Sequence, residues 1–149
     1  MKIEDEVKGR FRNEYHKGAI NLIYTVKHLG GDFLQTLKIH DLTEPQYNIL
    51  RVLRGFRSQE SISISFLKER MLDKNSDVSR IVDKLYEKEL INRNENKLDR
   101  RQKEIKITEK GIVLLKKLDH IEQFVDDYLK NLTSEEVVEL NRLLDKIRD

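Results

Sequence analysis

A short basic segment contains the residues whose types and spacing point most directly to chemistry. Residues 97–103 carry four cations, and Arg100 and Arg101 stand side by side among them. Residues 104–107 then alternate between charged and apolar side chains, which is the period of a strand with one buried face. The segment upstream can supply the partner strand. The sequence therefore predicts a hairpin over residues 91–107 with a cationic tip, and cationic tips suit a phosphate backbone.

The stretch directly before this hairpin predicts a helix with a polar first turn. It runs from about Asn75 to Lys88, and Asn75 or Ser76 can cap it. Arg80 can bind a guanine through two hydrogen bonds or hold a phosphate. Asp77 has two interpretations: it accepts a hydrogen bond from cytosine N4, or it is an acid favoured by the helix dipole. A helix followed by a basic-tipped hairpin is the plan of a winged helix-turn-helix, which reads double-stranded DNA.

Other elements must hold the predicted helix and hairpin in place. The first of them is a long amphipathic stretch. Residues 3–39 place apolar side chains in steps of three and four, which predicts one long helix with a bend or break at glycines 30–31. Thr43 and Gln46 can form the capping box of a second helix, over residues 44–54. Together these segments predict a mainly helical chain.

Shorter elements fill the remaining sequence. Residues 61–64 can form a very short strand beside the hairpin, and Ser63 or Ser65 can cap a short helix that ends near Met71. After the hairpin, residues 114–132 carry apolar side chains in steps of four and three, the heptad pattern of a helix that packs along another helix. A last amphipathic helix follows.

Composition and charge limit the classes of protein to consider. With 149 residues, of which 38% are charged and 38% hydrophobic in a clear period, the chain is expected to be one folded, soluble domain. The net charge of +2 does not indicate nucleic acid by itself. Its distribution is more informative: residues 93–106 have six basic and three acidic side chains, whereas residues 133–149 have three basic and five acidic ones. The positive charge therefore gathers on the predicted hairpin.

Several chemistries have no support in the sequence. No cysteine is present, which excludes disulfides, thiol nucleophiles and cysteine-bound zinc. No phosphate-binding glycine loop or nucleophile motif occurs, so we expect no enzyme and no cofactor. The four histidines are scattered, and we expect no metal site, although a site across helices near His16 or His120 stays open. No apolar run is long enough to span a membrane, and the cytoplasm is the expected location.

The hairpin resembles the signature of the MarR family of bacterial transcriptional regulators. The matching residues are Asp99-Arg100-Arg101, then three residues, Ile105, one residue, Ile107-Thr108, two residues and Gly111. Residues 76–85 resemble that family's recognition helix, and the order of helices matches over nearly the whole chain. One departure is Glu89, which stands where the family usually has glycine. Glycine permits a left-handed helix end that a side chain makes costly, so the exit of this helix and the aim of the wing are left open.

The resemblance implies a fold and an assembly. The fold would be a mainly α winged helix-turn-helix with long N- and C-terminal dimerisation helices and a small β-hairpin wing. Residues 1–149 would form a single MarR-like domain, with dimerisation helices in about 1–40 and 112–149 and a DNA-binding core in about 41–111. Intramolecular packing explains part of the apolar stripes, and a homodimer explains the rest. The implied function is a ligand-responsive repressor that binds a pseudo-palindromic operator.

The predicted DNA contacts follow from the helix, the hairpin and the resemblance. They are Lys74, Asn75, Ser76, Asp77, Ser79, Arg80, Lys84, Lys97, Asp99, Arg100, Arg101 and Lys103. The lysines suit phosphates, which set register rather than sequence. Arg100 or Arg101 is expected to enter the minor groove. The resemblance implies that Asp99 orients the loop through a salt bridge with one of these arginines.

Two further expectations concern partners. The resemblance implies that a small-molecule effector, if there is one, would bind between the first helix, the helix over residues 44–54 and the start of the helix after the hairpin. The candidate lining residues are Phe11, Tyr15, His16 and Tyr47, whose aromatic rings core packing explains equally well. The alternative function is a winged-helix module whose basic wing binds an acidic protein and which reads no DNA sequence. Salt-dependent binding to random duplex DNA would separate the two.

Overall fold

A computed structural model describes residues 2–59, 62–95 and 103–149 of the chain. It consists of two compact units. Leu34–Ile121 form the first, which we call the winged unit, and Met1–Phe33 with Glu122–Asp149 form the second, which we call the helical unit. Helices make up most of both units, and the one sheet among the described residues has two strands.

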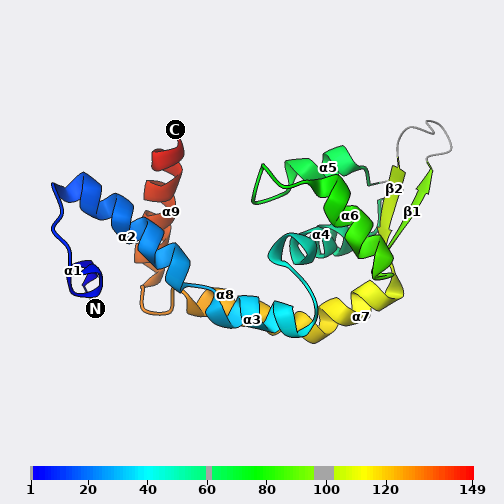
Figure 1. Cartoon of the computed structure of the whole chain (residues 1–149), viewed down its shortest axis with the longest axis horizontal. Coiled ribbons are helices and arrows are strands. Elements are labelled where there is room, and N and C mark those ends of the chain that lie inside the picture. The colour runs from blue at the N-terminus through cyan, green and yellow to red at the C-terminus, as the bar shows by residue number, and fades with distance from the viewer. Residues whose placement is uncertain (1, 60–61, 96–102) are drawn as a thin grey trace. The chain divides into compact units, whose positions relative to one another are not determined.

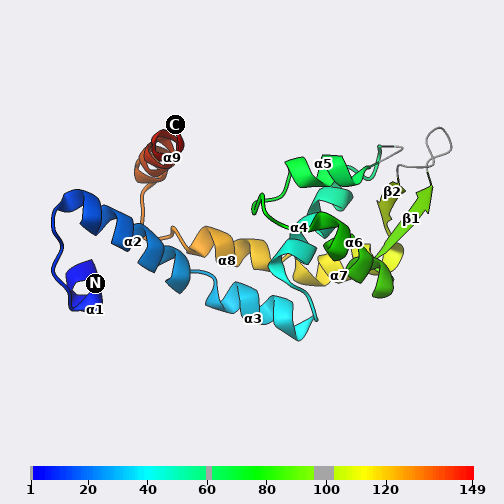
Figure 2. The same ribbon diagram turned by 45° about the horizontal axis from the view of Figure 1, so that its top comes forward.

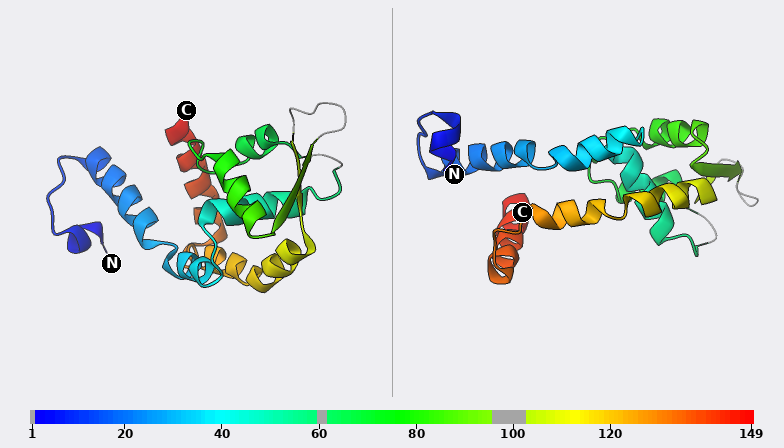
Figure 3. Two further views of the ribbon diagram at one scale, coloured as in Figure 1. Left: turned by 45° about the vertical axis from the view of Figure 1, so that its right-hand side comes forward. Right: turned by 90° about the horizontal axis from the view of Figure 1, so that it is seen from below.

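The winged unit contains the predicted helix-turn-helix and hairpin. Its elements are α4 (Glu44–Gly55), α5 (Ile64–Glu69), α6 (Val78–Glu87), β1 (Ile91–Glu95), β2 (Lys103–Ile107) and α7 (Glu109–Leu118). Helix α6 packs against α4, α5 and β1, while α4 also contacts β2 and α7. Figure 1 shows α6 between α5 and the hairpin, and the left view of Figure 3 shows the hairpin continuing into the yellow helix α7. The core is apolar, and its fully buried members include Ile49, Leu50, Leu53, Leu85, Ile105 and Leu115.

Helix α4 begins where the sequence predicts. The Thr43 hydroxyl accepts a hydrogen bond from the Gln46 amide at 3.4 Å, and the Gln46 side chain accepts one from the Thr43 amide at 3.2 Å. This reciprocal capping box satisfies two N–H groups that an α-helix leaves without internal partners. The predicted box is therefore confirmed, and the helix runs one residue further than expected, to Gly55.

The hairpin has the predicted strands and register. β1 and β2 are antiparallel, with Ile91 opposite Ile107 and Arg93 opposite Ile105. Ile105 is fully buried whereas Lys106 is exposed, so the predicted alternation between the two faces is confirmed. The predicted cationic tip falls in residues 96–102, which lie outside the described residues.

The prediction of a short strand over residues 61–64 is wrong for the part that the structure describes. Ile62 accepts a single hydrogen bond from the Ile105 amide at 2.9 Å, and no ladder follows. The reason is that Ser63 is the N-cap of α5: its hydroxyl accepts a hydrogen bond from the Phe66 amide at 3.1 Å. The chain therefore turns into a helix at Ile64, where a strand would have to continue.

Helix α6 begins later than the sequence predicts. The expected caps, Asn75 and Ser76, belong to a turn in which both of their amides donate hydrogen bonds to Asp73. The N-cap is Asp77 instead, since its carboxylate accepts a hydrogen bond from the Arg80 amide at 3.1 Å. The Val78 amide donates to the Ser76 carbonyl at 3.0 Å and is therefore not available to an Asn75 cap, so Asp77 takes the cap position at the end of this turn.

The exit from α6 is left-handed even without glycine. Glu89 has a φ of 60°. The Leu90 amide donates to the Leu85 carbonyl at 3.0 Å and the Glu89 amide donates to the Tyr86 carbonyl at 2.9 Å, which is the hydrogen-bond pattern of a Schellman cap. This answers the question that the sequence left open about the helix exit: the left-handed end is retained.

The helical unit differs from the single long helix predicted for residues 3–39. Its elements are α1 (Ile3–Val7), α2 (Glu14–His28), α3 (Gly31–Ile39), α8 (Ile121–Asp127) and α9 (Ser134–Arg148), of which α3 and α8 begin or end in the winged unit. The predicted interruption at the glycines is confirmed, because Gly30 has a φ of 92°. The break between α1 and α2 was not predicted. It arises because Lys8 is left-handed and Asn13 caps α2, accepting a hydrogen bond from the His16 amide at 2.9 Å.

Helix α1 is tied back to α2, as Figure 2 shows from a second direction. The Lys17 ammonium lies 2.5 Å from the Glu4 carboxylate, and this hydrogen bond lowers the pKa of Glu4. The Tyr24 hydroxyl donates to Glu6 at 2.7 Å, and its interaction with this carboxylate raises the pKa of Tyr24. Polar contacts thus fix the short first helix.

The heptad pattern over residues 114–132 forms two helices rather than one. A turn separates α7 from α8, and Asp119 in this turn is ion-paired with Arg54 at 2.7 Å. Leu118 and Ile121 are fully buried within their own chain. This part of the stripe therefore covers the winged unit's core, as the intramolecular explanation of the pattern requires.

Candidate nucleic-acid interface

The predicted contacts from the recognition helix lie at one end of α6. Ser79 and Arg80 are exposed in its first turn, while Val78, Val82 and Leu85 face the core. No ion pair involves Arg80 within the described part of the chain, so its guanidinium is available to a ligand. An amphipathic helix of this kind presents one polar face outward from a fixed apolar support.

Two of the predicted phosphate contacts hold oxygens of the protein itself. The Lys74 ammonium donates a hydrogen bond to the Glu69 carbonyl at 2.8 Å, at the C-terminal end of α5. Lys84 is paired with Glu87 at 2.9 Å. Both side chains are exposed, and exposed pairs of this kind are weak, so neither lysine is barred from a phosphate.

The structure supports one of the two interpretations of Asp77. Its carboxylate accepts the Arg80 amide and so caps α6. An acid at this position also interacts favourably with the positive end of the helix dipole. Base reading would have to compete with this hydrogen bond.

Arg93 joins the wing to α6, although in the sequence it stands out only by its positive charge. Arg93 on β1 forms an ion pair with Asp83 on α6, and its guanidinium lies 4.5 Å from the centroid of the Tyr86 ring. No local spacing indicates this contact, because ten residues separate the two charges. Of the predicted wing residues, Lys103 begins β2 opposite Glu95. The others, Lys97, Asp99, Arg100 and Arg101, lie outside the described residues.

The candidate ligand residues occur in two settings. Phe11 and His16 belong to the helical unit, where their rings meet edge to face with centroids 5.8 Å apart. Tyr15 is 90% exposed and lines a groove of about 870 Å³ between α2 and α9. Tyr47 belongs to the winged unit and is buried, with Arg51 against its ring.

A second hollow lies within the winged unit, beside α7. Its volume is about 680 Å³, within the range that suits a small ligand. Its wall combines apolar and basic side chains, including Leu90, Val113, Leu114, Lys88 and Lys110. The sequence did not indicate this hollow because its walls come from three separated segments.

Among residues 2–59, 62–95 and 103–149, no group of three or more histidine or acidic side chains is placed to hold a metal ion. No helix in the same ranges is both long enough and apolar enough to cross a membrane.

The winged unit matches a known family. Residues 42–103 match the model of the MarR family. Among solved structures, this chain is similar to BpsR of Bordetella bronchiseptica, whose DNA binding is regulated by 6-hydroxynicotinic acid (22% identity, TM-score 0.72, covering 89% of this chain and 99% of BpsR). It is also similar to MepR of S. aureus in complex with DNA (24% identity, TM-score 0.72, 93% and 97% covered). A MarR transcription factor from Planctomyces limnophilus is 27% identical (TM-score 0.68, 91% and 98% covered). No curated protein matches the chain.

Proposed function

Since residues 42–103 carry a MarR family domain in a winged helix-turn-helix fold, we propose that this chain is a DNA-binding transcriptional regulator. Helix α6 enters the major groove with its first turn, and the tip of the hairpin reaches the neighbouring minor groove. The observation that carries this proposal is the exposed polar start of α6, with Arg80 directed away from a buried apolar face. The similar MepR of S. aureus forms a complex with DNA, which supports DNA binding by this chain.

Each group of predicted residues has its own role in this proposal. Ser79 and Arg80 contact base edges, and Asp77 holds the first turn of α6 in shape. Phosphate contacts come from the lysines near α6 and from the hairpin, and they supply affinity that falls with salt. Arg100 or Arg101 adds readout of minor-groove width.

The regulator works as a homodimer in this proposal. Both α2 and α9 expose large apolar side chains: Val26 is 65%, Val138 69% and Ile147 68% exposed. A second copy related by two-fold symmetry would cover such surface and present a second α6 to the other half-site of a pseudo-palindromic operator.

A small molecule controls binding by preferring one dimer geometry. The hollow beside α7 is a candidate effector site in addition to the aromatic residues proposed from the sequence, because it combines an apolar wall with lysines. Regulation by 6-hydroxynicotinic acid in BpsR supports this type of control. We propose that the chain represses transcription. We also propose that it acts in the cytoplasm, because a transcriptional regulator acts where the DNA is.

The proposal is tested by selecting bound fragments from random duplex DNA and then measuring the affinity of the selected fragment at several salt concentrations. A DNA reader should enrich a palindrome and lose affinity steeply with salt. Weak, salt-dependent binding without enrichment would reduce the proposal to non-specific binding. Absence of DNA binding at low salt would favour the alternative, a module whose basic wing binds an acidic protein.

A further inference from the structure

Two corners of the winged unit share one unusual geometry. The first corner, residues 37–42, ends α3, and the second, residues 85–90, ends α6. Each has a left-handed residue that is not glycine: Asp41 with a φ of 54° and Glu89 with a φ of 60°. A side chain in this conformation is crowded against its own backbone, so the surrounding structure must hold it there.

The hydrogen bonds of the first corner repeat those of the second. The Leu42 amide donates to the Leu37 carbonyl at 2.9 Å, and the Asp41 amide donates to the Lys38 carbonyl at 3.0 Å. This is the same Schellman pattern that closes α6. In such a cap glycine is the usual left-handed residue because it has no Cβ. Both corners therefore lack glycine, which would adopt the left-handed conformation without strain.

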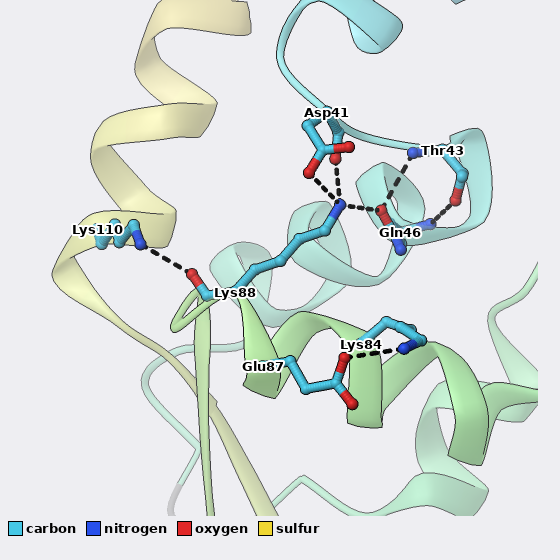
Figure 4. A network of polar contacts seen from close by, with 7 residues as sticks. All are labelled: Asp41, Thr43, Gln46, Lys84, Glu87, Lys88 and Lys110. Carbon is cyan, nitrogen blue, oxygen red and sulfur yellow. Dashed lines mark hydrogen bonds and ion pairs between the residues drawn. The ribbon is translucent and has the colours of Figure 1, made fainter.

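A lysine contacts each of these two left-handed residues. Figure 4 shows Lys88 against Asp41 of the first corner and Lys110 against the main chain of the second. The Lys88 ammonium contacts the Asp41 carbonyl, lies 3.1 Å from the Asp41 carboxylate and donates to the Gln46 side chain at 3.3 Å. The Lys110 ammonium lies 3.2 Å from the Glu89 carboxylate and donates to the Lys88 carbonyl at 2.9 Å. In both cases one ammonium binds a side-chain oxygen and a main-chain oxygen of the same corner.

The second corner sets the direction of the wing. Only Leu90 separates Glu89 from β1, so a change in the φ of Glu89 rotates the strand relative to α6. The corner is also fixed against α7: the Thr108 hydroxyl donates to the Glu89 carbonyl at 2.8 Å. A Cβ on Gly111 would lie 2.5 Å from the Leu90 carbonyl oxygen, which shows how closely α7 approaches.

We propose that Lys110 and Lys88 are positioning residues of the DNA-binding unit. They hold the two left-handed corners, and through the second corner they fix the angle between the recognition helix and the wing. This inference rests on the proposed function. It assigns to both lysines a task other than binding phosphate, and the salt dependence of DNA binding distinguishes the two tasks.

The test is a double-mutant cycle on the second corner. Lys110→Met keeps most of the side chain's volume and removes its charge, and Glu89→Gly removes the strain that Lys110 is proposed to offset. Lys110→Met should weaken binding to a selected DNA duplex about threefold to tenfold, which is below the roughly thirtyfold that the strain of one left-handed residue can supply at most. The same change in the Glu89→Gly background should cost less than about twofold. Lys116→Met removes a charge from an exposed position on the same helix and is the matched control.

The salt dependence separates positioning from phosphate binding. A lysine that binds a phosphate contributes about one unit to the slope of log affinity against log salt. Lys110→Met should leave this slope unchanged relative to the control. An equal loss of affinity in both backgrounds, a slope lower by one unit, or no loss in the wild-type background would each overturn the inference.

A readout without DNA keeps this inference distinct from the proposed function. Hydrogen exchange of the Leu90 amide reports whether the corner is closed. It should speed up about threefold to tenfold in Lys110→Met and return toward the wild-type rate in the double variant with Glu89→Gly. Unchanged exchange in Lys110→Met would refute the positioning role even if the chain binds DNA. Faster exchange in Lys110→Met, in a protein whose wild-type chain binds no DNA, would support the positioning role and refute the proposed function. Lys88→Met with Asp41→Gly tests the first corner in the same way.

Discussion

Arg93 on β1 is ion-paired with Asp83 on α6, and this contact joins the first strand of the wing to the recognition helix. The Arg93 guanidinium also lies over the ring of Tyr86. The side chains of the ion pair are 30% and 54% exposed, so the pair itself contributes about 1 kcal/mol or less to the free energy of unfolding. The main effect of this ion pair is on geometry, because it restricts the angle at which the hairpin leaves α6.

Replacing Arg93 with Met should weaken DNA binding more than it destabilises the chain. We expect the free energy of unfolding to fall by about 1 kcal/mol, from the lost ion pair and ring contact. Operator affinity should fall about threefold to tenfold as the wing loses its support. Asp83→Asn should have a similar effect on affinity, and the two changes together should cost little more than either one. Additive losses, measured by titration of a fluorescent duplex, would contradict a shared task.

Arg80 is expected to read the operator sequence. Arg80→Ala should cost roughly 1–3 kcal/mol of binding free energy at the selected operator and less on random duplex. Because Arg80 is exposed and caps nothing with its side chain, the unfolding free energy should stay nearly constant. An equal loss on both DNAs would make Arg80 a phosphate contact, and no loss on either would mean that α6 is not the recognition helix.

Asp77 is expected to act on the helix rather than on a base. Asp77→Ala removes the acceptor for the Arg80 amide and should lower the free energy of unfolding by about 1 kcal/mol in urea titrations. Asp77→Ser retains a good cap and should stay close to the wild type. If Asp77 instead reads cytosine, the serine variant will change the selected operator sequence while keeping full stability.

The paired wing arginines are expected to contribute affinity that depends on salt. Arg100→Ala together with Arg101→Ala should weaken binding strongly and lower the salt slope by about one to two units. Circular dichroism should show an unchanged helix content. A folded double variant with wild-type affinity at two salt concentrations would remove the wing from the proposed interface.

The dimer is best tested on the exposed part of the apolar surface. Leu118 is fully buried within its own chain, so a charge there would unfold the subunit and say nothing about assembly. Val138→Asp with Ile147→Asp changes two exposed side chains of α9 and should dissociate the dimer in sedimentation experiments, because a charge buried at an interface is costly. Asn141→Asp adds one negative charge at a polar position of the same helix and is the control. A wild-type monomer that binds a palindrome tightly would contradict the dimer.

Structure that depends on near neighbours in the chain was readable from the sequence. The capping box of Thr43 and Gln46 involves residues three apart, and the strand alternation around Ile105 involves residues two apart. Such contacts need only local backbone geometry. Where two local signals competed, as for the caps at Ser76 and Asp77, the sequence could not choose, because both side chains can cap a helix and the turn at Asp73 decided where the helix begins.

The tertiary structure decided the contacts that aim the recognition helix and the wing. Arg93 meets Asp83 only after the hairpin folds back on α6, and Lys88 meets Asp41 across 47 residues of sequence. Glu89 shows most clearly how tertiary contacts can override a local preference. Its backbone preference opposes the left-handed end of α6, yet contacts from Thr108 and Lys110 hold it there. The sequence thus determined most elements of the winged unit and the basic character of the hairpin. The angle between the helix and the wing depended on contacts between distant residues, and no local pattern encodes those contacts.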